Sequence, residues 1–541
     1  MGRRRNAVGL SLNYLLNWEV QLLKWWCEGR KYMSGKSRAS VGGILMLALL
    51  ISCAWAADDG GGKIDFESFA RYYYINPQPY KAPAAARSFL SSELAGVEES
   101  CDEDCRYSAA YVFGRIGQLE PNVVPQYHVL FEEGNHQQRM FMLDVLQLCG
   151  DKRTEEFFIS RLKAGRYINE GRRVKEVLAQ GIPVEFDPIN NTIESSLDVD
   201  LLWREFAITG SEEAIRHIIP VLGWFYDGDV RKKAIAVTAR WALSENSREH
   251  SQVAHVCRDE LAKSTGSTRR VLEEVVDDLE IFEILKRLEQ PGKAAESGDD
   301  RTEEGSRNQS TPTGSNGWAL GCSAVLTERN HHRHDLLAGG EINWKNIGKT
   351  KKLIDDWWGI TNREDLLSDL LRLSGGGHRE RFDIVGVYIV GISDDEYKEL
   401  LETYRDDEEM IQEMEVARKH YGELQGRGIS GWDYARFISL CRWGYMVGHL
   451  SEDEAWELIM PAARILQRRF DSWEDLGRNY LIGREFWSYE ETANSGYRYE
   501  DAYQRLAEMR DSPWNKYPWD MDLVDTMTTN DVGEAKPTKE R

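Results

Sequence analysis

The segment AWELIMPAARILQRRF, residues 455–470, spaces its apolar side chains as an amphipathic α-helix does. Just before it, Ser451 and Glu454 form a capping box, which marks a helix start. We therefore predict a helix here, kinked at Pro461 because proline lacks a backbone N–H and its ring clashes with the preceding turn. The residues that face the core on this pattern are Ala455, Leu458, Ile459, Ala462, Ile465 and Leu466.

The same pattern continues upstream of this helix. Capping boxes at Thr361 with Glu364 and at Ser393 with Glu396 mark two more helix starts. Only FDIVGVYIVGI, residues 382–392, has the β-branched and aromatic composition of a strand, and it fits a buried helix equally well, since one strand makes no sheet. We therefore predict an all-helical domain over residues 318–520. The first capping box precedes an amphipathic stripe of Leu366, Leu367, Leu370, Leu371 and Leu373.

Residues 63–290 also have helical periodicity, with breakers at irregular intervals. Val230, Ala234, Val237 and Trp241, for example, share one helical face. We predict paired helices stacked in a helical-repeat (α-solenoid, HEAT-like) domain. The predicted fold class is therefore all-α, with two helical domains. Further helical runs lie at residues 108–119, 138–148, 212–222 and 272–288.

Two polar stretches flank the second domain. Residues 291–317 are rich in Gly, Ser, Thr, Glu and Asp and contain almost nothing to bury, so we predict a disordered linker there. Residues 521–541 have a similar composition and are predicted to form a disordered tail.

The N-terminal region contains an apolar run, VGGILMLALLISCAWAA, at residues 41–57. With a basic start at Met33 and small residues at its end, residues 33–57 are typical of a signal peptide, so residues 1–32 are not expected in the mature protein. Three alternatives stay open: lipidation of Cys53 in a lipobox-like LISC, cleavage after Ala56, or an uncleaved anchor. Each predicts an exported chain, in the periplasm or at the outer membrane, which the first attaches by a lipid.

The charge of the chain restricts its partners. The formal net charge is −22, with 68 basic and 90 acidic residues. Residues 1–52 hold eight of the basic and two of the acidic residues, so the chain from Cys53 onward has 60 against 88, a net charge of −28. A surface with this much negative charge repels the phosphate backbone of nucleic acids, so we expect no nucleic acid partner.

The cysteines after Cys53 are too few and too scattered for a disulfide framework. Cys101 and Cys105 stand four residues apart, so a local bridge, or a bridge to Cys149, is one alternative. Free buried thiols and a metal site are the others, although a zinc site lacks a second pair of ligands. No cofactor is predicted.

An ordered series of motifs runs through the second predicted domain. It comprises Asp356-Trp357-Trp358-Gly359-Ile360 with Arg363; Gly431-Trp432-Asp433 with Arg436; Arg442, Gly444-Tyr445 and Gly448 ahead of Ala455-Trp456; Trp473 with Gly477; and Tyr480, Gly483-Arg484 and Trp487. As a set, it resembles the bacterial domain-of-unknown-function family 1266. The resemblance covers about 200 residues and implies an all-helical domain without an assigned reaction.

Several residues of this series can form a ligand site. Asp433 and Arg436 share a helical face, and so do Arg484 and Trp487. If these groups converge, the arginines can bind a carboxylate or phosphate between tryptophan walls. The alternative is that Asp433 and Arg436 form a buried structural ion pair. The candidate ligand-binding residues are Trp432, Asp433, Arg436, Arg442, Arg484 and Trp487.

A weaker candidate site lies in ERNHHRHDLL, residues 328–337. On a helix, His331, His334 and Asp335 would face one way and offer three zinc ligands, although no HExxH motif is present. A polar helix end is the alternative interpretation.

No catalytic motif stands out, and three functions remain. The first is a lipid-anchored protein that binds or scaffolds a protein partner without catalysis. The second is a receptor for a small ligand or anion at the Trp/Arg set. The third is a metal-assisted hydrolase using His331 and His334.

Overall fold

The computed structural model describes residues 64–92, 103–167, 169–180, 187–289, 309–424 and 426–523. These residues form α-helices and short 3₁₀ turns, and no β-strand occurs among them, so the all-α prediction is confirmed. The predicted signal segment with Cys53, as well as Cys101, lies outside the described residues. None of the described helices is long and apolar enough to span a bilayer.

The chain divides into two compact units, one ending at Leu272 and the other starting at Glu273. This boundary falls inside helix α14 (Gly266–Glu289) and therefore precedes the predicted linker. Of that linker, residues 309–317 are described, and helix α15 (Gly314–Gly321) begins within it. In the predicted tail, Leu523 is buried. The folded region therefore reaches into both polar stretches.

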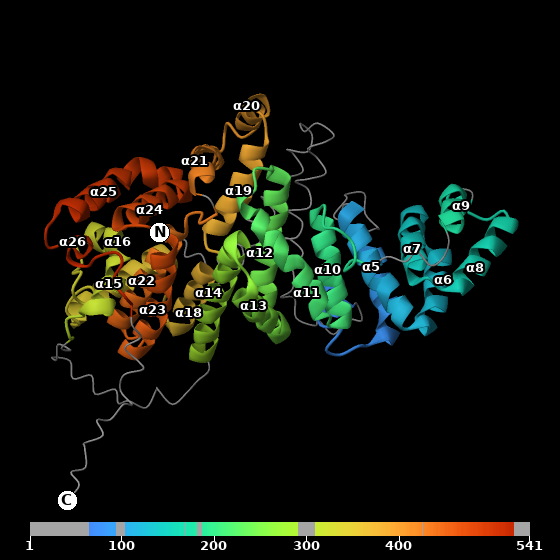
Figure 1. Cartoon of the computed structure of the whole chain (residues 1–541), viewed down its shortest axis with the longest axis horizontal. Helices are drawn as coiled ribbons and strands as arrows, with labels where there is room; N and C mark the ends of the chain where they lie inside the picture. The colour runs from blue at the N-terminus through green and yellow to red at the C-terminus, as the bar shows by residue number, and fades with distance from the viewer. Residues whose placement is uncertain are drawn as a thin grey trace, which may run out of the picture. The chain divides into compact units, whose positions relative to one another are not determined.

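The first unit consists of helices that pack mostly on their near neighbours in sequence. In Figure 1, α5 lies beside α7, and α10 beside α11. Helix lengths are uneven, which is compatible with a helical repeat but defines no constant period. The elements are α3 (Phe66–Arg71), η2 (Pro79–Lys81), α4 (Ala82–Ser92), α5 (Glu103–Leu119), η3 (Pro121–Val123), α6 (Val124–Glu133), α7 (His136–Cys149), α8 (Lys152–Lys163), α9 (Gly171–Gln180), α10 (Ser196–Thr209), α11 (Glu212–Ile218), η4 (Ile219–Tyr226), α12 (Val230–Glu249) and α13 (Ser251–Lys263).

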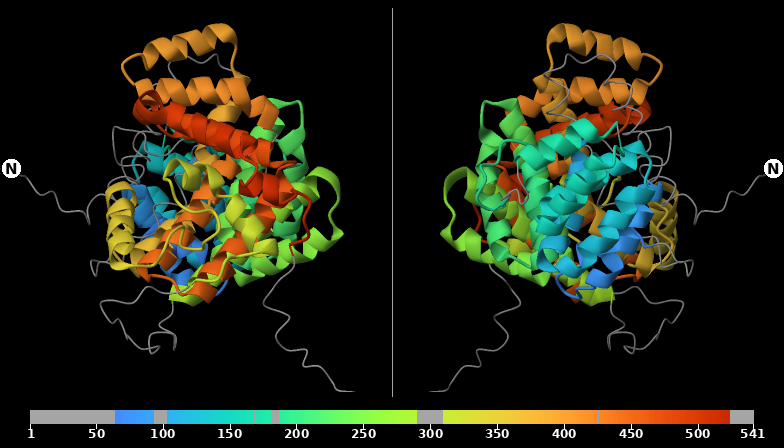
Figure 2. Two further views of the ribbon diagram at one scale, coloured as in Figure 1. Left: turned by 90° about the vertical axis from the view of Figure 1, so that its left-hand side faces the viewer. Right: turned by 90° about the vertical axis from the view of Figure 1, so that its right-hand side faces the viewer.

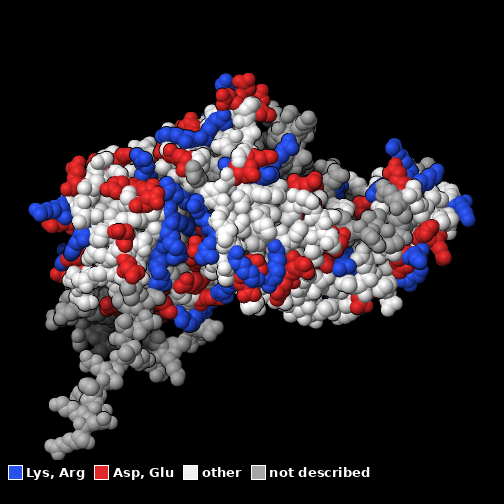
Figure 3. Space-filling view, in the orientation of Figure 1, with Lys and Arg blue, Asp and Glu red and all other residues white. Residues whose placement is uncertain are grey.

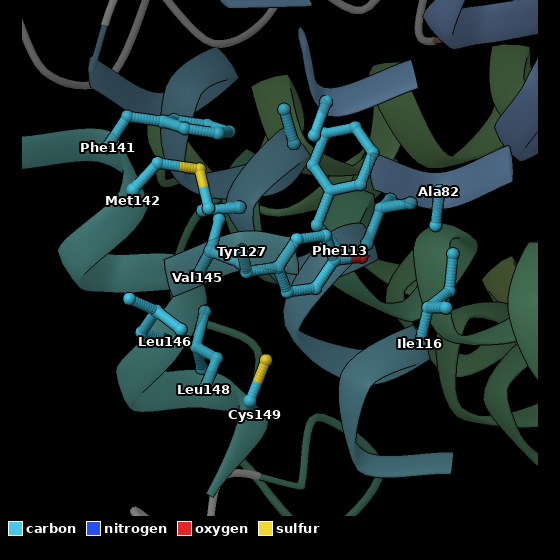
Figure 4. Close-up of a cluster of buried hydrophobic side chains, with 14 of the residues drawn as sticks. Ala82, Phe113, Ile116, Tyr127, Phe141, Met142, Val145, Leu146, Leu148 and Cys149 are labelled. Atoms are coloured by element: carbon cyan, nitrogen blue, oxygen red, sulfur yellow. The ribbon is translucent and has the colours of Figure 1, made fainter. Parts of the chain in front are cut away.

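The core of the first unit is rich in aromatic rings. Phe113, Tyr127 and Phe141 come from three different helices and meet in the cluster of Figure 4, with ring centroids 6.3–6.4 Å apart around Phe113. Helices α5 and α7 approach closely because α5 has glycines at their contact, and a Cβ at Gly114 or Gly117 would collide with α7. Close packing of this kind holds the first unit together.

The second unit is built around α22, all of whose residues are buried. Helices α17, α18, α23 and α24 surround it, and α25 lies across α16 and α24 (Figure 2). The elements after α15 are α16 (Ala324–Arg329), α17 (Trp344–Trp358), α18 (Arg363–Ser374), α19 (Arg379–Gly391), α20 (Asp394–Thr403), α21 (Glu408–Leu424), α22 (Ser430–Val447), α23 (Glu452–Arg469), α24 (Trp473–Trp487), α25 (Tyr489–Glu508) and α26 (Pro513–Lys516).

The local predictions for this unit can be compared with its helices. The capping boxes at Ser393 and Ser451 are confirmed. The one predicted at Thr361 is wrong by one residue, because Asn362 is the N-cap and accepts from the N–H of Asp365. Helix α23 continues through Pro461.

Of the two interpretations of FDIVGVYIVGI, the buried helix is correct, because residues 382–391 lie in α19. Its Gly386 packs against the ring of Tyr421 of α21, so closely that a Cβ would collide with the ring. Tertiary packing has therefore overridden the β-propensity of this segment.

The described cysteines fall into two groups. Cys105 is disulfide-bonded, and its partner lies outside the described residues. Cys149 is free, which excludes a bridge between these two. The free cysteines are buried, and burial raises the pKa of the Cys257 thiol to about 12, so this thiol stays protonated at neutral pH.

Candidate functional site

The carboxylate of Asp433 is buried at the start of α22 and held by the start of α19. The backbone N–H groups of His378 and Arg379 donate to it at 2.9–3.1 Å, and Arg436 Nη2 donates to its Oδ1 at 2.9 Å. Gly377, at φ 56°, lies against the carboxylate, and a Cβ there would be 2.5 Å from it. This glycine turn and helix start form an anion site that the protein's own Asp433 occupies.

Electrostatics keep Asp433 ionised. Burial acts to raise its pKa, but the hydrogen bond with His378 and the charges of Arg436 and Arg379 outweigh burial and hold the pKa well below its usual range. Asp433 and Arg436 thus form the buried ion pair that their spacing permits.

His378 borders this ion pair and is partly exposed. Its Nδ1 accepts a hydrogen bond from Arg436 Nη2 at 2.8 Å. Burial, with the charge of Arg436, lowers the pKa of His378 to about 4, so the ring is neutral near pH 7. The Arg436 guanidinium lies over the rings of Trp432, at 4.0 Å, and Trp358, at 5.3 Å.

Helix α14 completes the charge balance behind Asp433. Its Asp278 accepts from Arg379 Nη2 at 3.1 Å and from the hydroxyl of Tyr434. Its Glu274 lies 3.8 Å from the buried Arg469. The C-terminal half of α14 is therefore part of the core of the second unit.

Figure 3 shows a basic band over α14 and its neighbours, and ion pairs join α14 to α23 in this unit. Arg468 donates to Asp277 at 2.6 Å, and Arg464 lies 3.7 Å from Glu280. Each of these two arginines of α23 therefore faces a carboxylate of α14.

Arg442 is a second buried arginine of α22, and the protein satisfies it completely. Its Nη1 donates to Ser323 and Thr327 at 2.9 and 2.6 Å. Its Nε and Nη2 donate to the carbonyl groups of Leu337, Arg333 and Leu336 at 2.9–3.1 Å. Burial lowers its pKa to about 10. All five N–H groups have acceptors, so none is left for a ligand.

A different situation surrounds Tyr480 on α24, which we call the Tyr480 site. The Tyr480 hydroxyl, the Trp432 indole N–H and Arg484 Nε are buried and have no hydrogen-bond partner among the residues that the structure describes. The other nitrogens of Arg484 donate only to the hydroxyls of Thr492 and Ser495, both at 3.2 Å. Unmade hydrogen bonds are costly in a core, so three in one place require an explanation.

Aromatic rings form the walls of the Tyr480 site. The Trp432 ring lies 5.0 Å from the Tyr480 ring and 5.8 Å from the Trp487 ring. The Arg484 guanidinium lies over Trp487, at 5.2 Å, and over Tyr499, at 4.9 Å. The site is therefore aromatic and rich in donors.

Three arginines act on the Tyr480 hydroxyl, and two of them, Arg436 and Arg484, also lie near a carboxylate. Burial raises the pKa of Tyr480 well above its usual value, while the charges of Arg436, Arg484 and Arg329 act in the opposite direction. The acid nearest Arg484 among its described contacts is Glu491, at 3.6 Å and half-buried. The donors and the charge together suit a small anionic acceptor.

The structure brings part of the predicted ligand set together. Trp432, Arg484 and Trp487 meet at the Tyr480 site, whereas Asp433 and Arg436 pair with the start of α19. Arg442 belongs to neither group, because its hydrogen bonds go to separate carbonyl and hydroxyl groups. The prediction missed Tyr480, Tyr499 and Arg329. Tyr480 stands one helical turn before Arg484, a spacing that could have revealed it, but Arg329 has no local signal.

The residues of the predicted zinc site do not converge. Helix α16 ends at Arg329, so the helical arrangement assumed for His331, His334 and Asp335 is wrong. His334 Nε2 pairs with Glu328 at 3.0 Å, and Asp335 with Arg333 at 2.7 Å. Across the described ranges, no group of three or more His, Cys, Asp or Glu is placed to hold a metal ion.

A comparison with known protein families finds a match over the region that contains the motif series. Residues 354–519 match the family "Protein of unknown function (DUF1266)". The chain is 27% identical over 176 residues to the "Uncharacterized protein YbeU" of Escherichia coli (strain K12), covering 30% of this chain and 73% of that protein. It is 31% identical over 134 residues to the "Uncharacterized protein YbeR" of the same strain, covering 24% of this chain and 54% of that protein. No solved structure matches.

The DUF1266 match contains most of the Tyr480 site but not all of its support. It runs from the end of α17 to Trp519 and includes Tyr480, Arg484 and Tyr499. Arg329 and the carboxylates of α14 lie outside it. Elements before the DUF1266 region therefore complete its core in this protein.

Proposed function

We propose that this protein is an exported binding protein whose second unit holds a small anion, a carboxylate or phosphate, at the Tyr480 site. The observation that supports it is the set of buried polar groups without described hydrogen-bond partners at Tyr480, Trp432 and Arg484, near the guanidinium groups of Arg436 and Arg329. A charged acceptor makes shorter and stronger hydrogen bonds with such groups than a neutral one does.

The present hydrogen-bond partners of Arg484 compete only weakly with such an anion for its N–H groups. Thr492 and Ser495 are neutral acceptors at 3.2 Å, and both belong to the first half of α25. The site is closed in this structure, because the donor atoms are fully buried. Entry of an anion therefore requires that the first half of α25 move away from Arg484.

Tryptophan fluorescence of the full chain tests the proposal, since Trp432 and Trp487 border the site. Inorganic phosphate and acetate are titrated against sodium chloride of equal ionic strength. We expect a saturable change with at least one of the two anions, lost in Arg484→Met and kept in Arg498→Met. Arg498 is a matched control, because it lies on α25, is exposed and bonds only to Tyr497 among the contacts described. Equal responses of the two variants would overturn the proposal.

Protein binding is the second candidate function, and one surface of the first unit favours it. Tyr72, Ile75 and Tyr80 are exposed at 42%, 62% and 70% within nine residues of chain. Exposed apolar side chains grouped in this way are typical of interaction surfaces. A photo-cross-linking amino acid at Tyr80 should give a discrete adduct in cells. Adducts no different from those at the exposed Lys263 would remove this candidate.

Export is part of the proposal, and the disulfide of Cys105 supports it, because disulfides are rare in cytosolic proteins. We further propose lipid attachment at Cys53. Fractionation of cells expressing the wild type and Cys53→Ser tests the anchor. Attachment predicts that only the wild type stays with the membrane after a mild salt wash, and equal retention of both would contradict it.

A further inference from the structure

Helix α17 has an unusual charge distribution for this unit. Among helices α17 to α25, it alone has no acidic residue in its first turn, where Lys345 stands instead. Because the N-terminal end of a helix carries partial positive charge, a lysine there is unfavourable for the helix. The stability of α17 therefore does not explain its lysines.

These lysines are exposed, and three of them, Lys345, Lys349 and Lys352, share the outward face of the helix, with Lys351 at its flank. Lys345, Lys349, Lys351 and Lys352 lie in the first nine residues of α17, which contain no acid. Lys352 pairs with Asp356, one turn further along, while the other three have no acidic partner among the described residues. The exposed Asp355 and Asp356 follow on the same helix, so its positive charge is confined to the first nine residues.

An aromatic ring stands at the end of this patch. Trp344 is the most exposed large apolar residue described, at 79%. Gly348, between the lysines, has open space on its outer side. The apolar side of α17 is already buried against α22 through Thr350 and Ile354. The outward face is therefore the polar, lysine-bearing side of the helix.

We propose that the Lys345–Lys352 face of α17 docks on a membrane surface of anionic phospholipid, with Trp344 inserted at the headgroup level. Lysine side chains near a membrane are attracted to anionic headgroups, and tryptophan prefers the interface between water and lipid. This contact adds to any N-terminal anchor and does not depend on the Tyr480 site.

Vesicle binding by the full chain tests this proposal. Partition coefficients are measured on phosphatidylcholine vesicles with and without phosphatidylglycerol, and their ratio cancels the contribution of the apolar N-terminal run. Replacing Lys345, Lys349 and Lys351 by Gln should lower the ratio about 100-fold, or roughly fivefold for each lysine. Replacing the exposed Lys152, Lys163 and Lys175 of the first unit by Gln is the matched control.

The two triple variants remove the same charge, so only position distinguishes them. The control should keep the wild-type ratio, and a rise in salt concentration should reduce that ratio because salt screens exposed charges. Trp344→Ser should weaken binding to both kinds of vesicle. A wild-type ratio near one, or an equal fall in both triple variants, would overturn the proposal. Unchanged thermal unfolding of the variants confirms that the fold is intact.

Discussion

Arg442 and Arg484 are both buried in the second unit, yet their surroundings differ. Every N–H of Arg442 has a protein acceptor at 2.6–3.1 Å, although no carboxylate faces it. Arg484 has only hydroxyl acceptors for its hydrogen bonds, and its Nε has no acceptor. Burial of an arginine in a tryptophan-rich core is therefore no sign of a ligand site. Donors without acceptors are the better sign.

The largest loss of stability is expected when the carboxylates of α14 that face Arg379 and Arg469 are removed. A chain lacking residues 64–290 loses Glu274 and Asp278, which leaves Arg379 and Arg469 buried without these carboxylates. A chain lacking only residues 64–265 keeps all of α14. We expect cooperative thermal unfolding, measured by circular dichroism, from the shorter deletion alone. Cooperative unfolding of both chains at the same temperature would show that α14 is not needed.

The two arginines themselves give the next largest difference. Arg442→Met removes five hydrogen bonds and leaves the Leu337 and Arg333 carbonyl groups without this donor, while the Leu336 carbonyl keeps the N–H of Gly339. It should lower the free energy of unfolding by about 4 kcal/mol or more. Arg484→Met removes weaker bonds and should lower it by about 1 kcal/mol. Urea denaturation followed by tryptophan fluorescence measures both. If Arg484→Met proves as destabilising as Arg442→Met, Arg484 is a structural residue.

The pH dependence of stability probes the Asp433 cluster. The pKa of His378 is about 4 in the folded chain against about 6.5 when unfolded, so the unfolded chain binds more protons between these values. The contribution of neutral His378 to the free energy of unfolding is therefore fully present above pH 6.5. It is lost as the pH decreases towards 4, by up to about 3 kcal/mol.

Comparing the wild type with His378→Asn isolates this contribution. His128, His250 and His332 also have a pKa lowered by burial to about 4, but they remain in both chains. The difference in unfolding free energy between the chains should shrink from pH 7 to pH 4.5. A difference independent of pH would mean that His378 titrates normally.

The sequence was sufficient for the helices of this unit because their signals are local. A capping box such as Ser451 with Glu454 needs only four consecutive residues, and it was predicted correctly. Packing decided the outcome where the local pattern left two interpretations open. FDIVGVYIVGI has the composition of a strand, but the contact of Gly386 with Tyr421 keeps it helical.

The candidate site was only partly predictable, because its members come from distant segments. The pairing of Asp433 with Arg436 follows from helical spacing, and Trp432, Arg484 and Trp487 were selected through the motif series. Asp278 bonds to Tyr434 across 156 residues, and no local pattern announces such a contact. Whether a donor finds an acceptor is also a three-dimensional property, so Arg442 and Arg484 looked alike in the sequence.

The smallest effect is also the most discriminating, and it compares two buried tyrosines. The Tyr434 hydroxyl donates to Asp278, so Tyr434→Phe should lower the free energy of unfolding by about 2 kcal/mol. The Tyr480 hydroxyl is buried without a partner, so Tyr480→Phe should change it by less than about 0.5 kcal/mol or raise it slightly. Urea denaturation in a buffer free of phosphate and carboxylate measures both variants.

Adding the anion that the fluorescence titration selects should then separate the two tyrosines in the opposite direction. An anion that binds only the folded state stabilises it by mass action, so Tyr434→Phe should gain as much stability as the wild type does. Tyr480→Phe should gain less, because one donor to the anion is missing. Equal gains would place the anion away from Tyr480, and a loss near 2 kcal/mol for Tyr480→Phe without anion would mean that its hydroxyl already has an acceptor.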